Sequence, residues 1–260
     1  MNDRYKLSQF YNNNTPRLPF LSISDLKIKQ LPGFYINLDL PDGFSKKLKD
    51  IAEGRWAETL PKLENLKALG VNHRIGQEFF DAICQTPNLE HLFLFGSSAE
   101  NISSISKLQK LQKLYLHSFT RLTDISPLAT LKNLSVLSIE NCFKVENYEI
   151  LSQLPGLVGL ELCGDAFAPK HLILKSLKPF VTLKNLKHLA ISTVSVADKS
   201  YECFLEMEGL ERLDFLRRMP KSTRENIKSH HKNLKAGFFV DFDFENNKFY
   251  EGKDWSTSSN

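Results

Sequence analysis

Leucines recur along the chain in the pattern L-x-x-L-x-L, in which x stands for other residues, mostly polar. The pattern occurs eight times at spacings of 22 to 29 residues, with opening leucines Leu66, Leu89, Leu111, Leu134, Leu157, Leu186, Leu210 and Leu234. Alternation within each copy is typical of a β-strand, because successive side chains of a strand point to opposite faces. Repetition at a near-constant interval predicts a solenoid, in which each repeat packs on its neighbours.

The fold class that this pattern predicts is α/β, a solenoid of about eight repeats. Its strands form a curved parallel sheet on the concave face, and segments such as 76–85 and 147–154 return as short helices or turns on the convex face. The leucine side of each strand then faces the core. We expect burial at Leu92, Leu94, Leu114, Leu116, Leu137, Ile139, Leu160, Leu162, Leu189 and Ile191.

The two ends of a solenoid expose apolar surface unless another segment covers them. Residues 25–62 are expected to cap the N-terminal end with a strand and then an amphipathic helix. The repeats occupy 63–242, and residues 236–244 are expected to form a last edge strand that leads into a C-terminal cap and tail over 243–260. Residues 1–24 are polar and are expected to form a flexible arm. Extra residues between Leu157 and Leu186 are expected to form a loop or a longer convex helix.

The best copies read LEHLFL, LQKLYL, LSVLSI, LVGLEL and LKHLAI, and several opening leucines follow an asparagine. This repeat resembles that of the leucine-rich-repeat family, and residues 122–139 are similar to its short-repeat class, found in bacterial internalins and in a phosphatase regulatory subunit. The chain departs from the family at the third position after each strand, where Asn or Cys is usual and only Cys142 fits, with Asp165 as a possible stand-in. The resemblance implies a scaffold rather than an activity.

Outward residues of neighbouring strands lie about 4.8 Å apart and form columns across the sheet. The second and third repeats bring three aromatic rings together, and two glutamates continue the columns as an acidic strip. Large aromatic side chains on an outward sheet face are typical of protein interfaces. The predicted partner-binding residues are His91, Phe93, Phe95, Lys113, Tyr115, His117, Glu140 and Glu161.

Three features of the outward face admit two interpretations each. The N-terminal arm could instead cover the aromatic rings through Leu18, Phe20 and Leu21. His117 and Glu140 are close enough in the columns for a hydrogen bond, or they form a solvated pair with no role. A second contact area, or only a solvated face, is predicted around Asp214 from the basic residues Arg212, Arg217 and Arg218.

Composition narrows the class of partner. The 34 basic and 30 acidic residues give a net charge of +4 and are scattered together, whereas nucleic-acid binders usually concentrate basic residues on one face. Neither a secretory signal nor a run of 18 apolar residues occurs, so we expect a cytoplasmic protein that contacts neither nucleic acid nor membrane.

Motifs for catalysis or metal binding are missing from the sequence. The four cysteines stand 58, 21 and 40 residues apart, so we expect reduced and mostly buried thiols. His73, His91 and His117 fall on three separate strands without carboxylates or thiols placed to complete a tetrahedral site. Phosphate-binding loops and nucleophile elbows do not occur. We therefore predict no catalytic residues, no metal and no cofactor.

The function that these observations favour is a cytoplasmic protein–protein interaction module that binds a partner on its concave face without catalysis. A regulatory or immunity-type inhibitor is one form of it, by analogy alone. Two alternatives stay open. One is an enzyme or small-ligand receptor that uses His91, Tyr115, His117 and Glu140. The other is a structural adaptor subunit that binds through its convex side or its tails.

Overall fold

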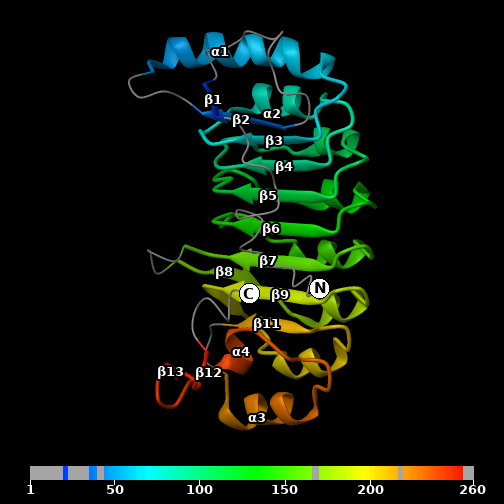
Figure 1. Cartoon of the computed structure of the whole chain (residues 1–260), viewed down its shortest axis with the longest axis vertical. Coiled ribbons are helices and arrows are strands. Elements are labelled where there is room, and N and C mark those ends of the chain that lie inside the picture. Colours follow the sequence, from blue (N-terminus) through cyan, green and yellow to red (C-terminus); the bar gives the residue numbers. More distant parts are fainter. Residues whose placement is uncertain (1–19, 23–34, 40–43, 166–169, 216–218, 254–260) are drawn as a thin grey trace.

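The computed structural model describes residues 20–22, 35–39, 44–165, 170–215 and 219–253. In this part of the chain, nine strands form one parallel sheet, in the order β1-β2-β3-β4-β5-β6-β7-β9-β11, and lie one above another like rungs (Figure 1). Their bounds are Phe20–Ser22, Tyr35–Asp39, Ala68–Val71, His91–Leu94, Lys113–His117, Val136–Glu140, Gly159–Cys163, His188–Ser192 and Arg212–Phe215. The predicted solenoid with a parallel sheet is confirmed.

The return segments of the repeats are short. The first is the helix α2, Gln77–Ile83. The later ones are 3₁₀ helices, Ser103–Lys107, Ser126–Thr130, Tyr148–Gln153, Lys178–Thr182 and Tyr201–Glu206. A 3₁₀ helix rises about 2.0 Å per residue against 1.5 Å for an α-helix, so five or six residues suffice to cross the repeat.

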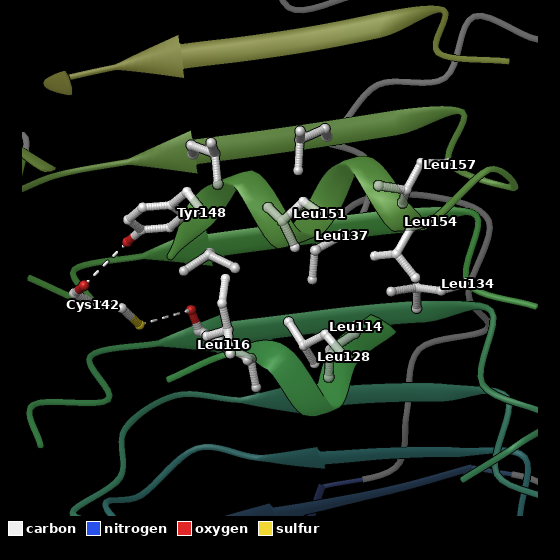
Figure 2. Close-up of a cluster of buried hydrophobic side chains, with 14 of the residues drawn as sticks. Leu114, Leu116, Leu128, Leu134, Leu137, Cys142, Tyr148, Leu151, Leu154 and Leu157 are labelled. Carbon is white, nitrogen blue, oxygen red and sulfur yellow. Dashed lines mark hydrogen bonds between the residues drawn. The ribbon is translucent and has the colours of Figure 1, made fainter. Parts of the chain in front are cut away.

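The core lies between the sheet and these return segments. All ten inward residues predicted to be buried are exposed by 1% or less, so the predicted strand register is confirmed. Figure 2 shows how Leu114, Leu116 and Leu137 of the strands meet Leu128 and Leu151 of the return segments. Each repeat therefore closes its core against the next one.

Cys142 occupies the turn position at which the leucine-rich-repeat pattern favours Asn or Cys. Its Sγ lies 3.8 Å from the carbonyl oxygen of Leu116, and its own carbonyl accepts a hydrogen bond of 3.1 Å from the Tyr148 hydroxyl (Figure 2). Burial raises the pKa of the Cys142 thiol to about 12. The thiol is therefore protonated at neutral pH and can serve as a weak donor in the turn.

The asparagines that precede opening leucines have a shared structural role. Each donates from Nδ2 to the carbonyl oxygen two residues before the opening leucine of the preceding repeat; they are Asn88, Asn133, Asn185 and Asn233. Where glycine stands instead, a Cβ atom would lie 3.3 Å from that carbonyl at Gly156 and 2.9 Å from it at Gly209. At these six positions the residue either bonds the passing backbone or leaves room for it, whereas Lys110, at the equivalent place before Leu111, bonds the side chain of Asn88.

The N-terminal cap is formed by β2 and by the helix α1, Lys46–Thr59, which agrees with the predicted strand and helix. Ser45 caps α1 by accepting a hydrogen bond from the Leu48 amide. Residues 20–22, within the range expected to be a flexible arm, form the strand β1, and the rest of that range lies outside the described residues. In the sheet, β2 and β3 lie between β1 and β4. Leu18 lies outside the described residues.

At the C-terminal end, the predicted last edge strand over 236–244 is wrong. Ala236 makes a single parallel bridge to Arg212, after which the chain turns at Gly237 into the short helix α4, Phe238–Asp241. Gly237 has a φ of 103°, and a Cβ atom there would lie 2.4 Å from the Leu213 carbonyl oxygen. The close approach of the two backbones stops the eighth repeat from forming a strand.

Beyond α4, the strands β12, Phe242–Asp243, and β13, Lys248–Phe249, pair antiparallel, and helix α3, Lys221–His230, lies at the end of the stack (Figure 1). The extra residues after Leu157 also differ from expectation. They include the strand β8, Leu172–Leu174, which pairs parallel with β10, Val194–Val196, in a second, two-stranded sheet. Side chains alternate along β8, so Leu172 and Leu174 are buried while Ile173 between them is exposed. This alternation is typical of a strand and not of a loop or a convex helix.

Candidate functional site

Three outward columns cross the concave face, and the strand register defines them. The central column consists of Phe93, Tyr115, Ser138, Glu161, Ala190 and Asp214. The leading column lies nearer the strand starts and consists of His91, Lys113, Val136, Gly159, His188 and Arg212. The trailing column consists of His117, Glu140, Cys163 and Ser192. The observed register thus agrees with the predicted columns, and of the described residues beyond β11 only Ala236 continues one of them, by a single bridge to Arg212.

The predicted aromatic residues meet on β4 and β5. The Phe95 and Tyr115 rings are 5.3 Å apart, and the Tyr115 and His117 rings stack at 6.0 Å with an angle of 6° between their planes. Phe95 and His117 are 6.4 Å apart. Three rings from two neighbouring strands therefore form one cluster.

The exposure of these rings differs from expectation. Phe93 is only 7% exposed and Tyr115 only 2%, and both pack with Val136 in a small apolar cluster separate from the main core. The expectation of solvent-facing rings is therefore wrong for Phe93 and Tyr115. Phe95 and His117 stay partly exposed.

A polar network continues from the rings into the trailing column. The Tyr115 hydroxyl donates a 2.6 Å hydrogen bond to Oε2 of Glu140, while Oε1 of Glu140 lies 3.6 Å from Nε2 of His117. The predicted approach of His117 to Glu140 is thus confirmed, although 3.6 Å is too long for a hydrogen bond. The side chains of His117 and Glu140 are 27% and 30% exposed, so both remain accessible beside the rings.

The leading column contributes His91 and Lys113, which lie side by side on β4 and β5. Burial, and then the positive charge of Lys113, lowers the pKa of His91 to about 4. Burial also lowers the pKa of Lys113. His91 is therefore neutral at pH 7 and contributes no positive charge to this side of the face.

Glu161 continues the acidic strip on β7 and is held by its neighbour on β6. The Ser138 hydroxyl donates a 2.7 Å hydrogen bond to Oε2 of Glu161. Burial raises the pKa of Glu161, and the charges of Glu140 and Asp214 raise it further, against the effect of the Ser138 hydrogen bond. The predicted acidic strip therefore exists, with Glu140 as its more accessible member.

The predicted second contact area around Asp214 is not a solvated basic face in its described part. Arg212 is 6% exposed, and its Nε donates a 2.6 Å hydrogen bond to Asp214 on the same strand. Asp214 also accepts a 2.7 Å hydrogen bond from the Phe238 amide. Arg212 and Asp214 thus join β11 to the C-terminal cap, and Arg217 and Arg218 lie outside the described residues.

The thiols are poorly suited to nucleophilic chemistry. None of the four cysteines forms a disulfide; three are buried as predicted, and Cys163 is partly exposed. Burial raises the pKa of Cys163 to about 11 and that of Cys203 to about 12, and it raises the pKa of Cys84. The reactive form of a cysteine is the thiolate, which is scarce at neutral pH for such groups.

The described residues form neither a cluster of metal ligands nor a membrane-spanning helix. Within those residues, no three His, Cys, Asp or Glu side chains are grouped as metal ligands would be. None of the described helices is both long and apolar enough to span a bilayer.

Two hollows lie away from the concave rings. One of about 440 Å³ lies between α1 and the start of α2 and is lined by residues that include Lys46, Asp50 and Arg74. The other, of about 400 Å³, lies near the strand starts and is lined by Glu90, Lys110, Gln112, Asn133 and Ser135. Neither includes a residue of the alternative small-ligand site at His91, Tyr115, His117 and Glu140.

Two residues of this site were missed at the sequence level. Asn141 has a φ of 56° and donates from Nδ2 to Nε2 of His117 at 3.2 Å, which orients the imidazole. Ser138 holds Glu161, as described above. An asparagine directly after a strand is a usable signal, because Asn tolerates positive φ better than most residues. A serine among outward positions offers no such signal.

Comparisons with known proteins agree with the solenoid fold described above. Residues 109–157 match the family model described as leucine-rich repeats in two copies. Internalin C2 of Listeria monocytogenes is 23% identical with a TM-score of 0.52, covering 68% of this chain and 73% of its own. Internalin InlF of the same species is 18% identical with a TM-score of 0.53, covering 78% of this chain and 66% of its own. No curated protein matches the sequence.

At these identities the two internalins show a common fold and not a common function. The family match falls on the repeats whose strands are β5 and β6, and it includes Tyr115, His117 and Glu140. These three residues of the candidate site therefore lie on repeats that match the family model. The chain therefore has the fold of a leucine-rich-repeat solenoid, and its residues 109–157 match the sequence model of that family.

Proposed function

We propose that the chain is a non-catalytic interaction module that binds a partner protein through its concave face. The contact centre is the ring patch, which we define as Phe95, Tyr115, His117 and Glu140. The observation that carries this proposal is the network in which Tyr115 bonds Glu140 and stacks on His117. Because the network fixes these side chains before binding, a partner would lose little conformational entropy in ordering them.

The charge of the face favours a protein partner over a nucleic acid. The described outward columns contain the carboxyl groups of Glu140, Glu161 and Asp214. Of their basic side chains, Arg212 is paired with Asp214, His91 is neutral, and burial lowers the pKa of Lys113. Nucleic-acid binding depends on lysine and arginine side chains that neutralise phosphates. Carboxylates along the centre of the face would repel phosphates and attract basic side chains of a protein.

The expected affinity depends on polar contacts. Phe95 could bury roughly 100 Å² at about 25 cal/mol per Å², a gross gain of roughly 2.5 kcal/mol. Association costs an estimated 4 to 15 kcal/mol, so this ring alone cannot hold a partner. His117 and Glu140 must supply further contacts, with Lys113 and Glu161 at the margin of the patch.

In this proposal the chain acts by covering part of its partner, as a regulatory subunit or an immunity-type inhibitor does. The cytoplasm is the proposed compartment. Four cysteines without a disulfide support it, since free thiols persist in reducing compartments.

The test is capture of a partner from the native lysate on immobilised protein, with a variant that changes the patch without touching the core. The double variant His117→Ala, Glu140→Ala should lose the captured partner and keep its melting temperature within a few degrees. The matched control is His230→Ala, Glu225→Ala, on exposed positions of α3. Equal recovery by both variants would overturn the concave-face assignment.

A further inference from the structure

The outer face of the capping helix α1 is apolar where a polar surface would be expected. Its inner face covers the first repeat through Ala52, Trp56 and Thr59, which are buried. On the other face, Leu48 is 48% exposed and Ile51 is 45% exposed. Terminal units of solenoids normally turn a polar face outward, since they protect the stack from solvent. The apolar residues of α1 therefore exceed what capping needs.

Gly54 lies on the same outer face, one turn after Ile51. Glycine inside a helix is unfavourable relative to alanine, so an interior glycine calls for a reason. A Cβ atom at Gly54 would meet nothing within 4 Å. Packing inside the chain therefore does not require glycine at this position. A missing side chain on a helix surface does allow a second molecule to approach closely.

Three charged residues complete this outer face. Lys47, Arg55 and Glu58 lie four residues before and four and seven residues after Ile51, which puts them on one side of a helix with 3.6 residues per turn. All three are exposed. Within the described residues, none of their side chains takes part in an ion pair or hydrogen bond. We call Lys47, Leu48, Ile51, Gly54, Arg55 and Glu58 the docking face.

We propose that the docking face binds the same face of a second copy of this chain, with the two α1 helices antiparallel. A two-fold axis then passes between Ile51 and Gly54, so that Ile51 of each copy packs into the space left by Gly54 of the other. In this register Lys47 lies directly opposite Glu58, and Leu48 contacts the aliphatic stem of Arg55. Each unlike pair occurs twice, because a two-fold interface uses one patch on both copies.

The charge order along the helix selects the antiparallel arrangement. With parallel helices, Lys47 would face Lys47 and Glu58 would face Glu58, so like charges would repel at both ends. With antiparallel helices, both ends have an attractive pair. The apolar residues stay central in either case, so the charges decide the orientation.

The size of the docking face sets the strength of the contact. α1 has 14 residues and is about 21 Å long at 1.5 Å per residue. One helix pair of this length buries less than the roughly 1,200 Å² at which stable complexes begin. The dimer is therefore weak and dependent on concentration. Because α1 lies at one end of the stack (Figure 1), the ring patch is not part of the contact, and this inference does not rest on the proposed function.

Sedimentation equilibrium of the whole chain from about 10 µM to 1 mM tests the inference. The weight-average mass should rise with concentration from 29.8 kDa toward twice that value. Ile51→Lys puts two ammonium groups beside the axis and should raise the dimer dissociation constant at least about tenfold. The matched control is Ile173→Lys on β8, where the native side chain is 64% exposed. It should leave the dissociation constant unchanged.

The charges supply a second, independent variant pair. Glu58→Lys should weaken the dimer, and adding Lys47→Glu to it should restore the association by exchanging the two signs. Both positions are exposed, so circular dichroism should show the native fold in each variant. A chain that stays monomeric throughout the concentration range overturns the inference. So does a dimer that Ile51→Lys leaves intact, or one that Ile173→Lys abolishes.

Discussion

The inward and outward sides of the same strands differ in how much their residues vary from one repeat to the next. On the inward side of β4 to β9, each strand repeats the same pair of leucine or isoleucine residues, all nearly inaccessible to solvent. On the outward side, β4 and β5 carry aromatic rings, whereas β6 and β7 carry serine, glycine and glutamate. The inward side repeats because every repeat must fill the same core. The outward side is under no such requirement, so its variation can serve binding.

Truncation of an inward residue should have the largest effect on stability. Leu137→Ala removes a fully buried side chain from the centre of β6 and leaves a cavity, so we expect the free energy of unfolding to fall by about 2 to 5 kcal/mol. Urea denaturation followed by circular dichroism measures it. Leu48→Ala, at a half-exposed position, is the control and should cost far less. Similar losses for both would show that the inward register is wrong.

The ring of Phe93 on β4 sharpens the comparison, since it points outward and yet is buried. Phe93→Ala should cost about 2 to 3 kcal/mol, below the upper range for a phenylalanine in a full core, because its cluster is small. The partly exposed Phe95, changed to alanine, should cost less. If Phe93→Ala left the denaturation midpoint unchanged, the ring would be dispensable for folding and could act as a free anchor for a partner.

At the turn of Gly237 the chain leaves the main sheet, and residues no longer alternate between its inward and outward sides. Gly237→Ala forces a Cβ atom against the Leu213 carbonyl at a φ that L residues rarely adopt, so we expect a loss of about 1 to 3 kcal/mol. Gly54→Ala, at a site with open space, is the matched control and should be neutral or slightly stabilising. A native-like melting temperature for Gly237→Ala would argue that the eighth repeat can form a regular strand.

The smallest expected effect concerns Glu161 and changes with pH. Its pKa is raised in the folded state by burial, so its contribution to stability is present below its unfolded pKa and is lost as pH rises through its folded pKa. Glu161→Gln keeps a hydrogen-bond acceptor for Ser138 and removes the buried charge. The variant should have the higher urea midpoint at pH 7, and the advantage should shrink toward pH 4. An advantage of equal size at both pH values would contradict the assignment.

The regular part of the fold was predictable from the sequence because one rule, alternation of leucines, determines the strands of the main sheet from β3 to β11. That rule also predicted that Tyr115, His117 and Glu140 lie close together. It could not show that Phe93 and Tyr115 are buried, since the burial of an outward side chain depends on tertiary contacts and not on its own alternation. It failed at Gly237 as well, where the backbone approach to Leu213 depends on tertiary structure and not on hydrophobic pattern.

The most direct test of the account is labelling of carboxyl groups on the two sides of one repeat. Glu140 lies on the concave face at the end of β6, and Glu149 is exposed on the return segment Tyr148–Gln153 that follows it. Carbodiimide labelling, read by mass spectrometry with and without the captured partner, compares them in one experiment. The account predicts that the partner protects Glu140 at least severalfold and leaves Glu149 unchanged. Protection of Glu149 with no change at Glu140 would contradict it.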